Sequence, residues 1–217
     1  KGAAAAGARS TAAGSIASGR AGHAAVRLAN GKVLVAGGGS GSGLLGLIDE
    51  ILDLSKIEAG KMELEYLEVA IGEIIDDMSS LFTPVAKSRQ LEFKVAVHPA
   101  VPEKIETDKI RLEQIIKNLI SNALKFTSKG SVSFEIRVCD SSSELLCFVV
   151  KDTGIGIPKE KQHLIFEAFQ QADGSTKRKF GGTGLGLSIS RELSKLLGGD
   201  IHVNSVVGEG SEFILRV

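Results

Sequence analysis

Hydrophobic residues from 61 to 217 recur with two alternating periods, one typical of strands and one typical of helices. Strand-like segments are expected at 62–70, 91–97, 132–138, 145–151, 200–205 and 211–217, and helical ones at 71–87, 108–126 and 184–197. Asp108 stands where it can cap the N-terminus of the longest of these helices. The alternation predicts an α+β fold in which helices cover one face of a sheet.

Residues 1–43 differ from the rest of the chain, because more than half of them are Ala or Gly and none is acidic. Such a segment buries little apolar surface, so we expect a fusion, a linker or a poorly specified region. Within it, 22–28 and 30–35 predict two short strands around an Asn-Gly turn; they resemble one strand pair of a kelch blade, which alone implies no propeller. A transit peptide is an alternative interpretation. Residues 37–43 predict a flexible joint.

Residues 44–59 have the pattern of an amphipathic helix that Gly60 ends. Its apolar face consists of Leu44, Leu47, Ile48, Ile51, Leu52 and Leu54. Nothing earlier in the chain offers a matching helix, so we expect this face to pack against a partner chain.

The overall composition excludes several classes of function. Lys plus Arg and Asp plus Glu number 26 each, so no net charge draws the chain to nucleic acid. The two cysteines, Cys139 and Cys147, are too few and too close for a disulfide framework, and a reducing compartment is the simplest interpretation. The apolar runs fall far short of the ~20 residues that cross a bilayer. We therefore expect no direct membrane contact from these residues.

Residues 118–127 form the first of four short blocks with chemical potential. Asn118 and Asn122 are four apart on the predicted helix, and Lys125 joins them on the same face. Amide oxygens and an ammonium group suit a polyphosphate with bound Mg²⁺. A surface helix with incidental asparagines is the alternative.

The second block, 152–158, begins with Asp152 at the end of a buried strand and continues with Gly154 and Gly156. A carboxylate there can accept a hydrogen bond from an adenine amino group, while the glycines let a ligand approach the backbone. A plain loop is equally compatible with this block.

The third block, 166–169, places two aromatic residues before a polar, basic stretch that reaches residue 180 and has the makings of a lid. A solvated basic loop is its alternative. The fourth block, 181–187, is glycine-rich and precedes a helix, so its backbone N–H groups can bind phosphate.

Together and in this order, the blocks resemble the N, G1, F and G2 boxes of two-component sensor histidine kinases, in the GHKL-type (Bergerat) ATPase superfamily. Asp108, Arg111, Leu112 and Gln114 before the first block match the same family. The resemblance implies a two-layer α/β sandwich: a mixed sheet of about five strands with three helices on one face. It divides the chain into the segment 1–43, a remnant dimerisation helix at 44–60 and an ATP-binding catalytic domain at 61–217.

The resemblance also implies roles for individual residues. Asn122 would bind Mg²⁺ with Asn118 assisting, Asp152 would hold the adenine amino group, and Lys125 and Arg178 would act on the phosphates. The residues implied in ATP binding are Asn118, Asn122, Lys125, Phe126, Asp152, Gly154, Gly156, Phe169, Gly182, Thr183, Gly184, Leu185, Gly186 and Ser211.

One family element has no counterpart in the sequence, namely the phosphoacceptor histidine followed by Glu-Leu-Arg-Thr-Pro. We therefore expect a histidine kinase domain that binds Mg-ATP but cannot phosphorylate itself. Its implied partners are a phosphoacceptor hairpin, a response regulator receiver domain and a second subunit in a homodimeric parent protein. A cytoplasmic location is implied, and anchoring of the parent protein in a bacterial inner membrane is left open. A GHKL-type ATPase and a catalytically silent binding module remain open as alternatives.

Overall fold

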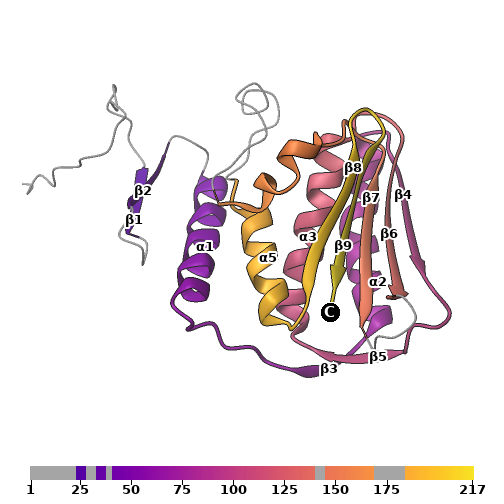
Figure 1. Cartoon of the computed structure of the whole chain (residues 1–217), viewed down its shortest axis with the longest axis horizontal. Helices are drawn as coiled ribbons and strands as arrows, with labels where there is room; N and C mark the ends of the chain where they lie inside the picture. Colours follow the sequence, from indigo (N-terminus) through magenta and orange to yellow (C-terminus); the bar gives the residue numbers. More distant parts are fainter. Residues whose placement is uncertain (1–22, 28–32, 38–40, 140–144, 169–183) are drawn as a thin grey trace, which may run out of the picture.

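A computed structural model describes residues 23–27, 33–37, 41–139, 145–168 and 184–217; side chains are described from residue 48 onward. Its main body is a five-stranded sheet with helices α2, α3 and α5 packed on one face (Figure 1). The strand order is β4-β6-β7-β9-β8, and only β4 and β6 run parallel. The expected mixed sheet of about five strands with three helices on one face is confirmed.

The bounds of these elements follow the sequence pattern closely. The strands are β4 Glu92–Val97, β6 Ser131–Val138, β7 Leu146–Asp152, β8 Asp200–Val206 and β9 Gly210–Arg216. The helices are α2 Ile71–Ser88, α3 Lys109–Phe126 and α5 Gly186–Leu196. Asp108 caps α3 as expected, because its side chain accepts a hydrogen bond from the backbone N–H of Arg111.

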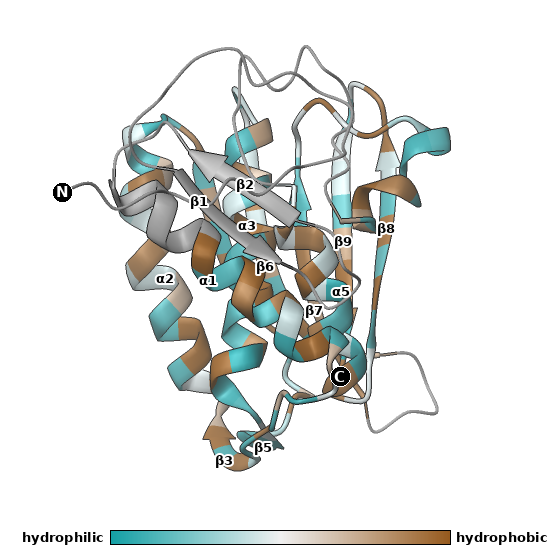
Figure 2. Cartoon of the chain, turned by 90° about the vertical axis from the view of Figure 1, so that its left-hand side faces the viewer, coloured by the Kyte–Doolittle hydropathy of each residue, from teal (hydrophilic) through white to brown (hydrophobic). Residues whose placement is uncertain are grey.

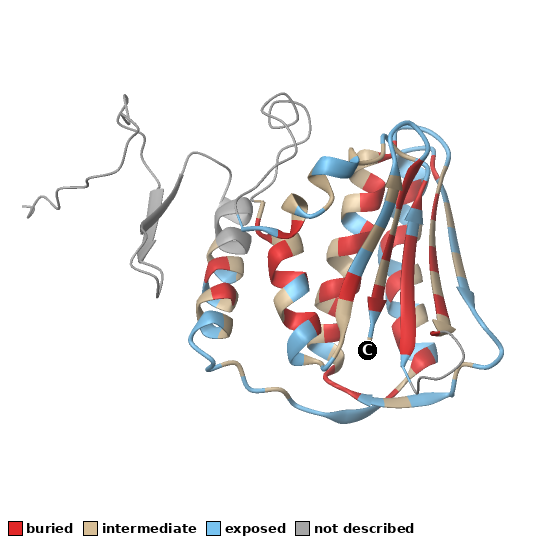
Figure 3. Cartoon of the chain, viewed as in Figure 1, coloured by how far each residue is buried: buried red, intermediate tan, exposed pale blue. Residues whose placement is uncertain are grey.

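The core lies between the helices and the inner face of the sheet (Figures 2 and 3). Alternate residues of β6, namely Val132, Phe134 and Ile136, are fully buried there, as period-two alternation requires. From α3, Leu112, Ile115, Ile116, Leu119 and Leu124 pack onto them. β7, at the centre of the sheet, is buried at every position except Lys151, so its outward-facing Cys147 and Val149 are covered as well as its inward-facing residues.

The two cysteines correct an expectation, because Cys139 and Cys147 form a disulfide. Antiparallel pairing of β6 with β7 brings the two Cα atoms to 5.2 Å. The pair packs with Val149 and Ile214 in a small apolar cluster separate from the main core. The expectation was wrong because the number and spacing of the cysteines do not reveal the antiparallel pairing of β6 with β7 that brings them together.

A second, two-stranded sheet pairs β3 Leu67–Ala70 with β5 Lys104–Thr107. The sequence pattern predicted a longer strand at 62–70 and did not predict β5, whose four residues are too few to show a clear period. Between β7 and α5, two short 3₁₀ helices follow the second block, 152–158. They are η1 Lys159–Lys161 and η2 Leu164–Phe166.

Near the N-terminus, β1 His23–Arg27 and β2 Val33–Gly37 pair antiparallel, with His23 opposite Gly37. The two expected short strands are therefore present, and the expected turn between them lies outside the described residues. Helix α1 spans Gly41–Glu58 and begins inside the segment expected to be a flexible joint. Gly60 ends it as expected: its φ is 63°, and the N–H of Lys61 bonds to the carbonyl of Lys56.

Helix α1 packs on its own chain, on the side of α5 (Figure 1). Ile51 and Leu54 are buried in the main core, and Asp53 reaches α3. The expectation that a partner chain covers this apolar face is corrected for Ile51 and Leu54, because α5 and the main core of the same chain supply the matching surface. Of the helices that the structure describes, none combines the length and apolar character needed to span a membrane.

Candidate functional site

The amide face of α3 is the centre of the candidate site. Asn118 and Asn122 are half-buried and contact each other, with Nδ2 of Asn122 donating to Oδ1 of Asn118 at 3.3 Å. Lys125 lies one turn further along, and its Nζ lies 5.1 Å from the ring centroid of Phe126. Burial lowers the pKa of Lys125. This face thus combines amide oxygens with a cation whose charged form is partly desolvated.

The start of α5 lies against this face. A Cβ added at Gly186 would overlap Oδ1 of Asn118, so glycine leaves room for the carboxamide in its present position. One turn later, Oγ of Ser190 accepts a hydrogen bond of 2.9 Å from Nδ2 of Asn118. The first described residues of the fourth block, Gly184 and Leu185, lead directly into this helix. The N-terminus of α5, where backbone N–H groups are uncommitted in an ordinary helix, therefore adjoins the first asparagine.

The second block reaches the other end of α3. A Cβ at Gly154 would lie 2.6 Å from the carbonyl oxygen of Phe126, and the N–H of Ile155 donates to that oxygen at 3.4 Å. The loop after β7 is thus held against the last residue of the asparagine helix. All three regions, α3, this loop and the start of α5, converge on one surface.

Asp152, the last residue of β7, is buried at this junction. Burial raises the pKa of its carboxyl, while hydrogen bonds from the backbone N–H groups of Gly154 and Ser211 oppose the rise. The N–H of Gly154 donates to Oδ1 at 2.8 Å. Two backbone donors therefore fix the carboxylate and leave acceptor capacity for a further donor.

Gly156 joins the same loop to the β8–β9 hairpin. Its φ is 68°, and a Cβ there would overlap the carbonyl oxygen of Val206. The N–H of Ile157 donates to Oγ of Ser205 at 2.7 Å, and Oγ of Ser205 lies 3.0 Å from Oγ of Ser211. The loop is anchored on both sides, by α3 and by this hairpin.

The structure brings together most of the residues that the sequence assigns to the site. Those converging are Asn118, Asn122, Lys125, Phe126, Asp152, Gly154, Gly156, Gly184, Leu185, Gly186 and Ser211. Phe169, Arg178, Gly182 and Thr183 lie outside the described residues.

Three residues around the site, Ser190, Ser205 and Gln162, were not predicted from the sequence. Gln162 links the loop to β8 by donating to the carbonyls of Ile157 and Ser205 at 3.0 and 2.8 Å. Ser190 was open to prediction, because it stands four residues after Gly186 and so shares its helix face. The other two depend on contacts across the fold that no local pattern encodes.

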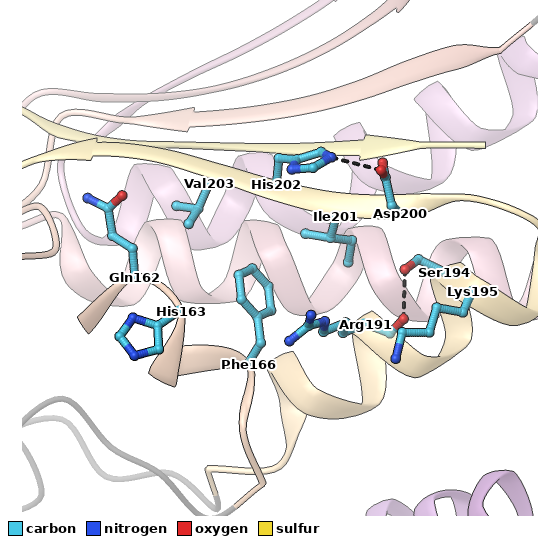
Figure 4. A pocket seen from close by; sticks show the side chains of 10 residues that line it. All are labelled: Gln162, His163, Phe166, Arg191, Ser194, Lys195, Asp200, Ile201, His202 and Val203. Carbon is cyan, nitrogen blue, oxygen red and sulfur yellow. Dashed lines mark hydrogen bonds and ion pairs between the residues drawn. The ribbon is translucent and has the colours of Figure 1, made fainter. Parts of the chain in front are cut away.

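A separate hollow of about 460 Å³ lies between η2, α5 and β8 (Figure 4). Phe166 and Ile201 contribute apolar surface, and the guanidinium of Arg191 lies 5.7 Å from the ring centroid of Phe166. His202 and Asp200 are joined at 2.8 Å on β8. None of the converging residues above lines this hollow, so it is distinct from the candidate site.

The protein-family model that describes the histidine kinase-, DNA gyrase B- and HSP90-like ATPases matches residues 107–217. The chain belongs to this family of ATPases. Within the family it has the sequence and fold of a histidine kinase catalytic domain.

Curated relatives are named as a sensor protein and as a histidine-protein kinase. The sensor protein GacS of Pseudomonas syringae pv. syringae is 43% identical over 176 residues, which are 80% of this chain and 19% of the relative. The signal transduction histidine-protein kinase BarA of Escherichia coli K12 is 39% identical over 180 residues, 82% of this chain and 20% of the relative. The chain thus spans about a fifth of the length of these relatives.

Solved structures are also similar to this chain. Full-length ShkA, crystallised in complex with AMPPNP, is 34% identical with a TM-score of 0.72, covering 82% of this chain and 36% of that one. Histidine kinase ThkA in complex with the response regulator protein TrrA is 27% identical with a TM-score of 0.63, covering 81% of this chain and 47% of that one.

Proposed function

We propose that residues 61–217 bind Mg-ATP and transfer its γ-phosphoryl group to a histidine of a dimerisation hairpin. The observation that carries the proposal is the convergence of the Asn118/Asn122 face, the loop of Gly154 and Gly156, and the glycine-led start of α5 on one surface. The complex of the similar ShkA with AMPPNP supports a nucleotide as the ligand.

The residue types at this surface fit a magnesium nucleotide. Asn122 would hold Mg²⁺ through its amide oxygen with Asn118 assisting, because a hard cation takes oxygen ligands. Asp152 would accept a hydrogen bond from the adenine amino group, and Phe126 would lie by the base. Bound Mg²⁺ would supply neutralisation of phosphate charge.

The phosphate end of the site combines backbone and cationic groups. Gly184, Leu185 and Gly186 would present N–H groups at the start of α5. Lys125 and Arg178 would offset charge that builds up as the γ-phosphoryl group moves. In-line transfer needs positioning and charge neutralisation more than covalent chemistry from the protein.

The acceptor histidine would come from a helical hairpin of which α1 is the second helix. No histidine in the sequence is followed by Glu-Leu-Arg-Thr-Pro. We therefore expect Mg-ATP binding without self-phosphorylation from this chain alone. A receiver domain of a response regulator is the proposed downstream partner, supported by the complex of ThkA with TrrA. A homodimeric parent and a cytoplasmic location belong to the same proposal.

Calorimetry with ATP, with Mg²⁺ and in EDTA, tests the nucleotide site. Asp152→Asn should weaken binding by about 1–3 kcal/mol in both conditions, because it leaves a ligand amino group without its acceptor. Asn122→Asp should reduce mainly the magnesium-dependent part. Equal nucleotide affinity in both variants and the parent protein would contradict the assignment.

Radiolabelled ATP distinguishes phosphotransfer from other outcomes. Supplied with a separate phosphoacceptor hairpin, the protein should form acid-labile, base-stable phosphohistidine on the hairpin and none on itself. Steady hydrolysis of ATP without any labelled hairpin would indicate an ATPase instead.

A further inference from the structure

Ser190 on α5 is a buried hydroxyl group that contacts the amide face of α3. Only 2% of the surface of this residue is exposed. Oγ accepts a hydrogen bond of 2.9 Å from Nδ2 of Asn118. The contact exists because Gly186, one turn earlier on the same helix face, has no Cβ to displace the Asn118 carboxamide. Gly186 and Ser190 together form the surface of α5 that contacts the Asn118 carboxamide.

The hydrogen bond continues to the second asparagine. Oδ1 of Asn118 accepts from Nδ2 of Asn122 at 3.3 Å. Ser190, Asn118 and Asn122 thus form a directed chain, in which each NH₂ group donates toward α5. If Asn118 alone rotated by half a turn, its NH₂ group would face the NH₂ group of Asn122, and two donors would oppose each other. The chain therefore fixes which end of each carboxamide points where.

We propose that Ser190 is a positioning residue for the metal ligand, acting through Asn118 to keep the oxygen of Asn122 directed toward the bound cation. This inference rests on the proposed Mg-ATP function. The NH₂ group of Asn122 is committed to Asn118, which leaves its Oδ1 for the metal. A divalent cation requires that oxygen, since an NH₂ group cannot ligate it. Groups that orient a ligand from behind commonly change metal affinity by about 10-fold or more when removed.

Ser194 on the same helix offers a matched control. It is also buried, with none of its surface exposed, and its hydroxyl donates to the carbonyl of Arg191 on its own helix. Ser194→Ala removes a buried hydroxyl from α5 without touching either asparagine. Ser190→Ala removes one that the amide chain uses. Ser190→Cys keeps a side chain of similar shape whose thiol accepts hydrogen bonds weakly.

The experiment measures the magnesium-dependent gain in ATP affinity, which is the ratio of Kd in EDTA to Kd with Mg²⁺. Ser190→Ala should lower this ratio by about 10-fold and leave the Kd in EDTA within about twofold of the parent value. Ser190→Cys should give an intermediate ratio, and Ser194→Ala should match the parent protein. The amount of Mn²⁺ bound in the presence of ATP, measured by electron paramagnetic resonance, should rank the parent protein and its variants in the same order.

Three results would overturn the inference. One is a parental ratio in both Ser190 variants. Another is an equal fall in Ser194→Ala, and the third is a loss in EDTA as large as the loss with Mg²⁺, because either would mark general damage to α5. A parent protein that binds no ATP in either condition would instead refute the proposed function, and this inference with it. A parent protein that binds ATP equally in both conditions would refute the metal role alone.

Discussion

The carboxylate of Asp53 on α1 accepts a hydrogen bond of 2.8 Å from Nε2 of Gln114 on α3, and the same oxygen lies 3.5 Å from Nη1 of Arg111. Gln114 in turn accepts from Nη1 of Arg111 at 2.9 Å. The three side chains form a compact polar link beside the buried apolar face of α1. This link ties a helix from outside the family match to the helix that carries the site.

Removing Asp53 should loosen α1. Asp53→Ala should lower the free energy of unfolding by about 1–2 kcal/mol, because a partly buried hydrogen bond to a charged group is lost and Nε2 of Gln114 loses its acceptor. Urea denaturation monitored by circular dichroism measures the change. Asp49→Ala, which removes an exposed carboxylate one turn earlier on the same helix, is the control and should change stability little. Equal effects of the two substitutions would show that the link contributes nothing.

The apolar face of α1 can be tested independently. Leu54 is 4% exposed and Leu52 is 45% exposed. Leu54→Ala should lower the free energy of unfolding by about 2–4 kcal/mol through lost burial and a residual cavity, and Leu52→Ala by less than about 1 kcal/mol. Thermal and urea unfolding of both variants at two protein concentrations give the answer. If Leu54→Ala costs no more than Leu52→Ala, the packing of α1 on its own chain is wrong.

Substitutions at Gly156 and Gly208 distinguish the cost of steric overlap from the cost of backbone strain. Both have positive φ, 68° and 84°, but a Cβ at Gly156 would overlap the carbonyl of Val206, whereas a Cβ at Gly208 would meet nothing within 4 Å. Gly208→Ala should cost about 1 kcal/mol of stability, and Gly156→Ala at least about 2 kcal/mol with weaker ATP binding. The comparison needs unfolding curves and calorimetry. Similar costs at both sites would mean that the loop shifts freely.

Asp152 should make stability depend on pH. Burial raises its pKa in the folded protein above the ordinary value of 3.8. The folded state therefore holds this proton more tightly than the unfolded state, and stability falls as pH rises from about 3.8 through the raised pKa. Without nucleotide, Asp152→Asn should become more stable relative to the parent protein as the pH rises above about 4.

Urea unfolding across that range checks the Asp152 prediction. Asp76→Asn, which alters an exposed carboxylate on α2, controls for the loss of one negative charge. A constant difference between Asp152→Asn and the parent protein at every pH would refute it.

Reduction of the Cys139–Cys147 disulfide should destabilise the β6–β7 hairpin. The two residues are separated by eight positions, and closure of so short a loop contributes about 2.5 kcal/mol in the chain-entropy description. Unfolding with and without dithiothreitol should differ by about that amount. The double variant Cys139→Ser/Cys147→Ser should be insensitive to the reductant. Alkylation of both thiols in the unreduced protein, detected by mass spectrometry, would contradict the bond.

The sequence predicted well those elements whose burial has a regular period. α3 was predictable to within a residue because a capping aspartate precedes a long amphipathic run, and β6 because Val132, Phe134 and Ile136 alternate with polar residues. β5 was missed because four residues cannot display a period. The candidate site residues were predicted as a set because four short blocks occur in one order, and those that the structure describes converge on one surface.

The contacts between distant segments were not predictable. Nothing in the run from Leu44 to Leu54 states whether its partner is another chain or α5, since any complementary apolar surface satisfies the same pattern. The same holds for Ser190, whose hydroxyl could have faced its own helix as Ser194 does. Pairing of the cysteines likewise depended on strand register.

Helix α3 is one continuous helix that carries both the residue bonded to α1 and the proposed metal ligands. Gln114, Asn118 and Asn122 follow one another at intervals of four, so they lie in a row that extends roughly 12 Å along the helix. A tilt or axial shift imposed through Asp53 would displace the ligands directly, without any intervening loop. Mechanical input at one end of α3 would thus set the placement of the nucleotide at the other.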